Sequence, residues 1–405
     1  MKTRTTLFLG AALAGVIGLS CSKGSGFWDS FIPETDEEPT SAQVTGYVFR
    51  PALVPATPER IQQLKVPAGF KVQAFAQEVG KPRILAVSSQ GYVYVSDRDA
   101  GMVTLLEDKD KDGVAERKQM VASIKQAHGL AIHNSKLYIA AVQDLYVADI
   151  NSDGTLSQPK LIKSGLPDGG QHPNRTLAFG PDGLMYFSIG STCNSCPEPN
   201  AMHATMVRMN ADGSNMKIYA KGLRNTIGFG WHPETKEFWG MDHGIDWLGD
   251  EEQKEEVNLI KENGVYGWPY IYEDGKYNPG TRPPGDTTYQ QYSQLSTKPS
   301  LTYQAHAAPM QMAFYTGSQF PSDYQGDAFV AMRGSWNRSK PSGYSVVRMH
   351  FENGKPVRFE DFLTGFLVDN NRSHIGRPVG VAVHADGSLL VSDDTNGVIY
   401  RISRQ

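Results

Sequence analysis

The sequence predicts an all-β protein folded as a six-bladed β-propeller. Short apolar runs alternate with period two between turns, and few segments are long enough for helices. The 41 glycines and 24 prolines among 405 residues favour many short strands joined by turns. Hairpin-like units recur along the chain, and the turns of the first four lie 44 to 52 residues apart. A repeat of this length, with room for four strands, is typical of a propeller blade.

Six such units follow one another, each with an apolar strand, a polar turn and a second apolar strand. They span residues 83–97, 128–141, 175–189, 227–242, 310–332 and 379–393. A single domain, residues 46–405, is therefore expected to contain all six blades. A long insertion at about 245–305 follows a second strand, so we expect it to emerge at the same face and to form a pocket wall. The run TGYVF near Tyr47 is expected to supply the strand that closes the ring with the last blade.

The first 45 residues differ in character from the rest. Lys2 and Arg4 precede the apolar run LFLGAALAGVIGL, which is too short to span a bilayer, and SCSKG follows it. Residues 1–20 are therefore predicted to be a lipoprotein-type secretory signal peptide that ends before a lipid-modified Cys21; a single membrane helix is the alternative. Residues 21–45 are polar and acidic without a pattern, as expected of a flexible tether. We expect an exported protein anchored to a bacterial membrane only by this lipid, on the periplasmic or cell-surface side.

Charge and cysteine content narrow the partners and the chemistry. The formal net charge is −4, which argues against a nucleic-acid partner. With Cys21 assigned to lipid, Cys193 and Cys196 remain, and in an oxidising compartment such a C-x-x-C pair favours a local disulfide. Pro197 rather than a histidine follows the pair, which excludes a haem attachment site, and no second pair exists to complete a zinc site.

The strand ends predict a binding site on one face of the ring. In a propeller the first strand of each blade lines the central channel and runs away from one face, and the second strand returns to it, so residues flanking these strands converge around one mouth. Those before first strands are Arg83, His128, His172, Arg175, Arg224, Asn225, His306 and Arg377; those after second strands are Asp97, Ser191, Asp242, His243, Arg333, Asp393 and Asp394. Guanidinium groups suit carboxylates, so we expect a compact polyanion near the axis, with histidine as the group for proton transfer; scattered surface arginines are the alternative.

Six stretches form an ordered set of motifs. They read VPAGFKVQAFA, GQHPNRTLAFGPDG, GLRNTIGFGWHP, MDHGIDWLGDEEQ, MRGSWNR and GRPVGVAVHADGSLLVSDD. In this order they resemble the soluble pyrroloquinoline quinone (PQQ)-dependent sugar dehydrogenases, specifically the glucose/sorbosone dehydrogenase branch, from about Val66 to Arg401. The resemblance implies an enzyme with PQQ and calcium (Ca2+) as cofactors. Its reaction would oxidise an aldose, or a sorbosone-like sugar aldehyde, at the anomeric carbon to the lactone or acid, with a quinone or cytochrome as external electron acceptor.

The resemblance also implies roles for individual residues. His172 matches the base that removes the proton of the anomeric hydroxyl, and Arg224 and Asn225 match the pair beside the reactive quinone carbonyl. The backbone carbonyls of Gly244 and Ile245 match the calcium ligands. Further cofactor contacts are expected from His243, Arg333 and Arg377, and sugar contacts from Tyr303 and His306. Proton removal from an alcohol needs a base that titrates near neutrality, and the developing oxyanion needs a cation beside it.

Several features leave alternatives open. Ser191 and Gln171 stand where well-studied glucose dehydrogenases have acids near the base, so base activation can differ here. A calcium-dependent propeller lactonase or esterase would need side-chain carboxylates converging on the metal, and a non-catalytic propeller that binds a glycan or a protein would need no cationic ring. The run DKDKDG at 108–113 has the acid spacing of a calcium loop, but Gln119 stands at its twelfth position, which favours a solvated hairpin turn.

Overall fold

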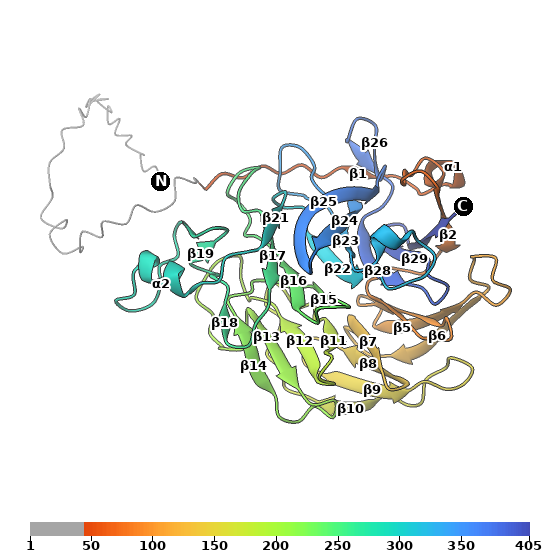
Figure 1. The fold of residues 1–405 in the computed structure, drawn as a ribbon, viewed down its shortest axis with the longest axis horizontal. Coiled ribbons are helices and arrows are strands. Elements are labelled where there is room, and N and C mark those ends of the chain that lie inside the picture. The colour runs from red at the N-terminus through yellow and green to blue at the C-terminus, as the bar shows by residue number, and fades with distance from the viewer. Residues whose placement is uncertain (1–43) are drawn as a thin grey trace, which may run out of the picture. The chain divides into compact units, whose positions relative to one another are not determined.

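The computed structural model describes residues 44–405, and within them six β-sheets are arranged as blades around a central axis (Figure 1). The prediction of an all-β, six-bladed propeller is confirmed. The predicted signal peptide, Cys21 and nearly all of the tether fall in residues 1–43 and lie outside the described residues.

The first three blades take their strands in chain order from the axis outwards. Blade one consists of β3 (Leu85–Val87), β4 (Val93–Asp97), β5 (Met102–Glu107) and β6 (Arg117–Ser123). Blade two consists of β7 (Gly129–His133), β8 (Lys136–Ala140), β9 (Leu145–Asp149) and β10 (Lys160–Lys163). Blade three consists of β11 (Leu177–Phe179), β12 (Met185–Ile189), β13 (Thr205–Met209) and β14 (Lys217–Lys221). Each hairpin predicted from the period-two pattern therefore forms the two inner strands of a blade.

The remaining blades draw on more distant segments. Blade four consists of β15 (Gly228–Trp231), β16 (Phe238–Asp242), β17 (Glu255–Leu259) and β21 (Leu301–Tyr303). Blade five consists of β22 (Pro309–Phe314), β23 (Ala328–Met332), β24 (Ser345–Glu352) and β25 (Lys355–Leu363). Blade six consists of β28 (Pro378–Val383), β29 (Leu389–Asp393), β30 (Val398–Arg404) and, from the start of the domain, β2 (Phe70–Ala76).

The closing strand is β2, and its prediction near Tyr47 is wrong. β2 pairs antiparallel with β30 beside the C-terminus, and Phe70 and Phe75 on it are buried. Tyr47 and Val48 are 46% and 63% exposed, and the ladder of blade six does not include them. The run FKVQAFA buries Phe70 and Phe75 in blade six, whereas Tyr47 and Val48 of TGYVF stay exposed, so the hydrophobic effect selects the former.

The predicted insertion is divided by the structure. Residues 255–259 are the third strand of blade four, with Glu255 2% and Val257 0% exposed, and residues 301–303 are its fourth strand. The excursion therefore leaves from the third strand rather than the second. It carries β18 (Gly264–Val265), which pairs parallel with β14 of blade three, and the hairpin of β19 (Ile271–Tyr272) and β20 (Lys276–Tyr277). The excursion thus runs along the outer edge of blade three.

The remaining elements are short. They are α1 (Pro58–Ile61), α2 (Tyr289–Leu295), a 3-10 turn (Ser322–Tyr324), and a small sheet of β1 (Ala52–Leu53), β26 (Leu367–Val368) and β27 (Ser373–His374). None of the helices in residues 44–405 has the length and apolar character needed to cross a membrane.

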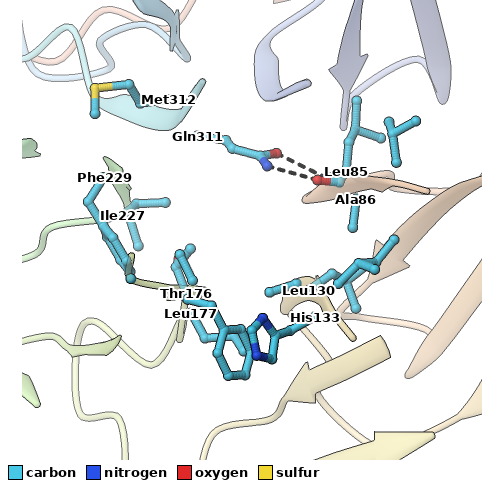
Figure 2. Close-up of a pocket in the computed structure, with 16 residues that line it drawn as sticks. Leu85, Ala86, Leu130, His133, Thr176, Leu177, Ile227, Phe229, Gln311 and Met312 are labelled. Atoms are coloured by element: carbon cyan, nitrogen blue, oxygen red, sulfur yellow. Dashed lines mark hydrogen bonds between the residues drawn. The ribbon is translucent and has the colours of Figure 1, made fainter. Parts of the chain in front are cut away.

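The central channel is lined by the inner strands and is largely apolar (Figure 2). A cavity of about 410 Å³ lies among residues of β3, β7, β11, β15 and β22. Gln311 crosses part of the channel: its Nε2 donates to Leu85 O (2.8 Å), and its Oε1 accepts from the N–H groups of Leu85 (3.0 Å) and Val381 (3.2 Å). This side chain therefore links blades one, five and six at the axis.

Candidate active site

Charged residues from several blades meet at one mouth of the ring. Asp394, after β29, accepts hydrogen bonds from Arg83, before β3, and from Arg333, after β23, whose Nε and Nη2 lie 3.1 Å from its two oxygens. His128, before β7, has Nε2 3.5 Å from Nη2 of Arg83. Burial alone would raise the pKa of Asp394, but the positive charges of the two arginines outweigh it and hold the pKa below its usual value. The convergence predicted from the strand ends is present for these residues.

A cavity of about 530 Å³, called here the cationic cavity, lies beside this ion cluster. It is lined by Leu53, Lys81, Arg83, Arg98, Asp99, Asn174, Arg333, Asp394 and Thr395. Four of these side chains are cations and two are carboxylates. The Nε atoms of Arg83 and Arg98 are buried and have no hydrogen-bond partner among residues 44–405. An unpaired buried donor costs free energy, so the cavity favours a guest that brings acceptor oxygens.

Sequence reasoning missed six of the nine residues that line the cationic cavity: Leu53, Lys81, Arg98, Asp99, Asn174 and Thr395. Among them, Arg98 directly follows Asp97 at the end of a second strand. Extending the strand-end rule by one residue would have found it. Nothing in the local sequence distinguishes Lys81 from an ordinary surface lysine.

His172 is held by the strand end beside it. Its Nδ1 lies 2.8 Å from Ser191 Oγ and 3.1 Å from Ser191 O, and Ser191 Oγ donates its proton to Cys193 O (2.8 Å). Because that hydroxyl proton is already used, Nδ1 carries the hydrogen and donates it, which leaves Nε2 with a free lone pair. Burial, and next the positive charge of Arg224, lower the pKa of His172 to about 2. The imidazole is therefore neutral with its lone pair at Nε2, although its pKa lies far below the near-neutral value that the sequence predicted for the base.

We expect Ser191→Asp to raise the pKa of His172. A carboxylate against Nδ1 favours the protonated ring, whereas the serine hydroxyl offers no charge. The pKa of the imidazole should then rise from its low wild-type value. Below the new pKa the ring is protonated and can no longer accept the sugar proton. NMR titration of the ring C–H protons measures it, with Ser191→Ala as the uncharged control. An unchanged titration in the aspartate variant would contradict the assignment.

Arg224 and Asn225 are positioned by the carboxylate of Asp242. Asp242 accepts from the N–H of Arg224 (2.7 Å) and of Asn225 (2.8 Å), which ties the start of β15 to the end of β16. The Arg224 guanidinium donates from Nε to Asn194 O (3.0 Å) and from Nη2 to Asn194 Oδ1 (2.8 Å). The Asn225 amide lies 3.4 Å from Nδ1 of His243. The predicted pair is thus buried beneath the mouth and rigidly held.

In the loop after β16, the carbonyls of Gly244 and Ile245 point away from the side chains that hold the loop in place. Ile245 N–H donates to Gln253 Oε1 (3.0 Å), and Asp246 N–H donates to Asn194 Oδ1 (2.8 Å). Both peptides are trans, so each preceding carbonyl points opposite to the N–H. The carbonyls of Gly244 and Ile245 therefore point away from Gln253 and Asn194, as ligands for a cation must.

The packing around that loop explains why residue 244 is a glycine. A Cβ at Gly244 would lie 2.7 Å from Gln253 O, which is closer than real Cβ contacts come. Gly244 N–H donates to Glu255 Oε2 (3.0 Å), and burial raises the pKa of Glu255 to about 8. His243 is bonded to Pro309 O, and burial lowers its pKa to about 4, so it is neutral. The close packing leaves room only for glycine at this position.

Two predicted arginines hold backbone instead of facing the cationic cavity. Arg175 is fully buried, and its guanidinium donates to carbonyls of residues 142, 167, 168 and 172. Arg377 donates to the carbonyls of Arg333 and Gly334, and its guanidinium lies 5.4 Å from the ring centre of Tyr344. Arg377 therefore positions the segment that carries Arg333, and a direct cofactor contact by Arg377 is not required by its geometry.

The two predicted sugar contacts are not brought together. Tyr303 ends the outermost strand of blade four, with its ring 4.9 Å from that of Phe359 on the outermost strand of blade five. It belongs to the packing between blades. His306 is buried, with Nε2 2.9 Å from Gly249 O and Nδ1 3.2 Å from Asn337 Nδ2. The structure places neither side chain on the lining of the cationic cavity.

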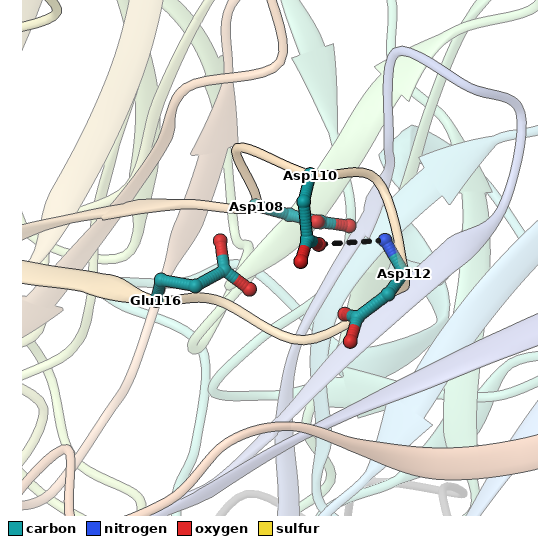
Figure 3. A group of neighbouring side chains, drawn as sticks. All are labelled: Asp108, Asp110, Asp112 and Glu116. Carbon is teal, nitrogen blue, oxygen red and sulfur yellow. Dashed lines mark hydrogen bonds between the residues drawn. The ribbon is translucent and has the colours of Figure 1, made fainter.

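The run at 108–113 forms the loop between β5 and β6, as expected of a hairpin turn (Figure 3). Asp108, Asp110, Asp112 and Glu116 each place one oxygen within 4.8 Å of the others. Glu116, rather than position twelve, completes this acidic group. Oxygens of Asp108 and Asp112 accept the backbone N–H of residues 113 and 114, so part of the group serves to hold the turn.

Comparisons with known proteins identify relatives of the chain. The profile of the family described as Glucose / Sorbosone dehydrogenase matches residues 133–401. An uncharacterized protein of Borreliella burgdorferi is 29% identical over 366 residues, covering 86% of this chain and 92% of that protein. A pyrroloquinoline quinone-dependent pyranose dehydrogenase of Coprinopsis cinerea is 25% identical over 422 residues, covering 86% of this chain but only 56% of that protein. A calcium structure of Trichoderma reesei Carbohydrate-Active Enzymes Family AA12 shares the fold, with a TM-score of 0.75 and 21% identity over 85% of this chain and 98% of that chain.

Proposed function

The chain belongs to the glucose/sorbosone dehydrogenase family, and on this premise we propose that it is a PQQ- and calcium-dependent sugar dehydrogenase. Its substrate is an aldose or a sorbosone-like sugar aldehyde, oxidised at the anomeric carbon to the lactone or acid. One observation carries the proposal: a cationic cavity opens at the same mouth as a histidine whose Nε2 is free to accept a proton. A Coprinopsis cinerea relative is a PQQ-dependent pyranose dehydrogenase, which supports this chemistry.

The cationic cavity fits a compact tricarboxylate such as PQQ. Its volume of about 530 Å³ is within the range of small-molecule sites. Arg98 contacts the described acids only at 3.9 Å, to Asp99, so its guanidinium is free for a carboxylate of a guest, while Arg83 and Arg333 already share Asp394. Arg98 is therefore proposed as the principal carboxylate-binding arginine, with Arg83 and Arg333 beside it.

The loop after β16 fits calcium, because calcium prefers oxygen ligands and accepts backbone carbonyls. Gly244 and Ile245 would supply those carbonyls. A calcium structure exists for a Trichoderma reesei relative with this fold, which supports the assignment.

The residues of the chain then have the following roles. His172 Nε2 accepts the proton of the anomeric hydroxyl, with Ser191 and Cys193 keeping the other proton on Nδ1. Arg224 places a fixed positive charge beside the position where negative charge develops. When bound, PQQ supplies hydride acceptance and calcium supplies Lewis-acid polarisation.

The cell location and the acceptor belong to the same proposal. An exported protein anchored through Cys21 would hold the propeller near a membrane, where a quinone or cytochrome can take the electrons.

A metal-dependent lactonase would instead need carboxylates that are free to bind the metal. In the described residues, Asp394 pairs with two arginines and Asp242 accepts from backbone N–H groups, so both of these acids already have partners.

The test is cofactor binding followed by turnover. Apo-protein titrated with PQQ in calcium should bind it, and a panel of aldoses with a dye acceptor should then show activity that is absent without PQQ. Arg98→Ala should weaken PQQ binding by about 2 kcal/mol, roughly 30-fold. The Arg98 side chain is only 25% exposed, so in the variant a PQQ carboxylate would lose its positively charged partner at a partly desolvated position. Arg358→Ala, which changes an exposed arginine on β25, is the control. Absence of PQQ binding by the wild type, or hydrolysis of a lactone instead of sugar oxidation, would overturn the proposal.

A further inference from the structure

A disulfide closes the four-residue loop 193–196, which is separated from the end of β12 by three residues. Cys193 and Cys196 are bonded to each other, and Asn194 and Ser195 lie between them. The predicted disulfide is thus present in the structure. The loop reaches the proposed base through Ser191, and it contacts the proposed active-site arginine directly. We propose that this disulfide-closed loop is a positioning element that sets the tautomer of His172 and the orientation of Arg224 together.

The first connection runs through Ser191. Its hydroxyl has one proton and gives it to Cys193 O (2.8 Å), so towards His172 Nδ1 (2.8 Å) it can only accept. If Cys193 O moved away, the hydroxyl could turn and donate to Nδ1. The imidazole proton would then occupy Nε2, where the sugar proton must arrive. Ser191 O, 3.1 Å from Nδ1, can also accept this hydrogen. The carbonyl of residue 193 inside the loop therefore acts together with Ser191 O to keep the proton on Nδ1 and the lone pair on Nε2.

The second connection runs through Asn194. Its O and Oδ1 accept from Nε (3.0 Å) and Nη2 (2.8 Å) of Arg224, so both bonds lie on one edge of the planar guanidinium. The remaining nitrogen, Nη1, is directed away from the loop. Asn194 Oδ1 also accepts from Asp246 N–H (2.8 Å), and Asn194 O accepts from Trp268 Nε1 (3.4 Å). Asn194 therefore joins the arginine to the segment that carries the proposed calcium ligands.

The rest of the loop is anchored to the excursion from blade four. Ser195 Oγ lies 3.0 Å from Thr281 Oγ1 and accepts from Asn278 Nδ2 (2.9 Å). Cys193 packs in an apolar cluster with Ala204 and Ile245. A covalent closure of so short a segment restricts the loop to few conformations, which keeps the carbonyl of residue 193 and the amide of residue 194 in register with their partners.

The catalytic role of the loop rests on the proposed function. Its effect on the positions of His172 and Arg224 can be tested without measuring activity. Asn194→Leu removes the side-chain acceptor while keeping the size, and Asn194→Asp retains an oxygen for Arg224 and for Asp246 N–H. Cys193→Ala with Cys196→Ala opens the loop. Asn210→Leu, in the turn after β13, is the matched control.

Two readouts are made on each protein. Nitrogen-15 NMR of the apo-protein reports the tautomer of His172 and the Nε–H signal of Arg224. Turnover and PQQ affinity are then measured on the reconstituted protein. Asn194→Leu should shift the Arg224 signal and lower turnover by about 10²-fold, since small misplacements of reacting groups have effects of that size. Asn194→Asp should restore most of both, and the open-loop variant should mix the two tautomers of His172.

Reduction provides a second route if the open-loop variant does not fold. Dithiothreitol should produce the same tautomer mixing in the wild type, and reoxidation should reverse it. An Arg224 signal unchanged by Asn194→Leu, together with a single Nδ1–H tautomer after reduction, would overturn the inference. If these apo-protein signals change as expected while wild-type protein binds no PQQ, the loop has its positioning role and the proposed function fails.

Discussion

Replacing His172 with glutamine lowers turnover of the reconstituted protein by about 10²–10⁴-fold, the usual contribution of a positioned general base. The structure gives the physical reason. Burial and Arg224 keep the imidazole neutral, and Ser191 keeps its proton on Nδ1, so Nε2 is the one atom of this side chain that can take the sugar proton. Glutamine retains hydrogen-bonding capacity but has no basic nitrogen.

PQQ affinity separates this role from a binding role. The cationic cavity does not include His172 in its lining, so the variant should bind PQQ nearly as well as the wild type. Turnover and binding are measured on the same preparations. A glutamine variant that retains wild-type turnover, or that loses activity only because it no longer binds PQQ, would show that His172 is not the base.

Removing calcium lowers turnover by roughly 10³-fold or more, because Lewis-acid polarisation contributes several kcal/mol to stabilising the developing charge. Gly244→Ala should raise the calcium concentration needed for activity. The new methyl group would lie 2.7 Å from Gln253 O, so the segment with the proposed carbonyl ligands must move. The measurement is turnover against free calcium after the protein has been prepared with chelator and reloaded with PQQ.

Gly230→Ala serves as the control for this substitution. A Cβ there meets only ring atoms of Phe314, the nearest at 3.6 Å, which is an ordinary contact. This variant should keep the wild-type calcium dependence. Full activity of PQQ-loaded protein after exhaustive chelation would contradict the metal role, and an unchanged calcium requirement in Gly244→Ala would contradict the location of the site.

The amino-acid sequence determines the blades because the residues that specify each blade lie close together in the chain. Alternating apolar residues and turn residues define each hairpin, and the repeat length defines a propeller. The same local pattern placed His172 and Ser191 at adjoining strand ends, and the structure joins them through a hydrogen bond. The cysteine pair three residues apart also needed no tertiary information to predict its disulfide.

Residues at equivalent positions of different blades have different environments, and these environments are decided by the tertiary structure. Arg175 and Arg224 both precede an inner strand, yet the guanidinium of Arg175 binds backbone carbonyls, whereas that of Arg224 meets Asn194 from the neighbouring blade. Sequence also misplaced the closing strand, since Phe70 and Phe75 have a buried place only after the C-terminal strand has formed beside them. Hydrogen bonding and burial depend on what lies across a blade interface, and the local pattern of a strand contains no information about its neighbour in space.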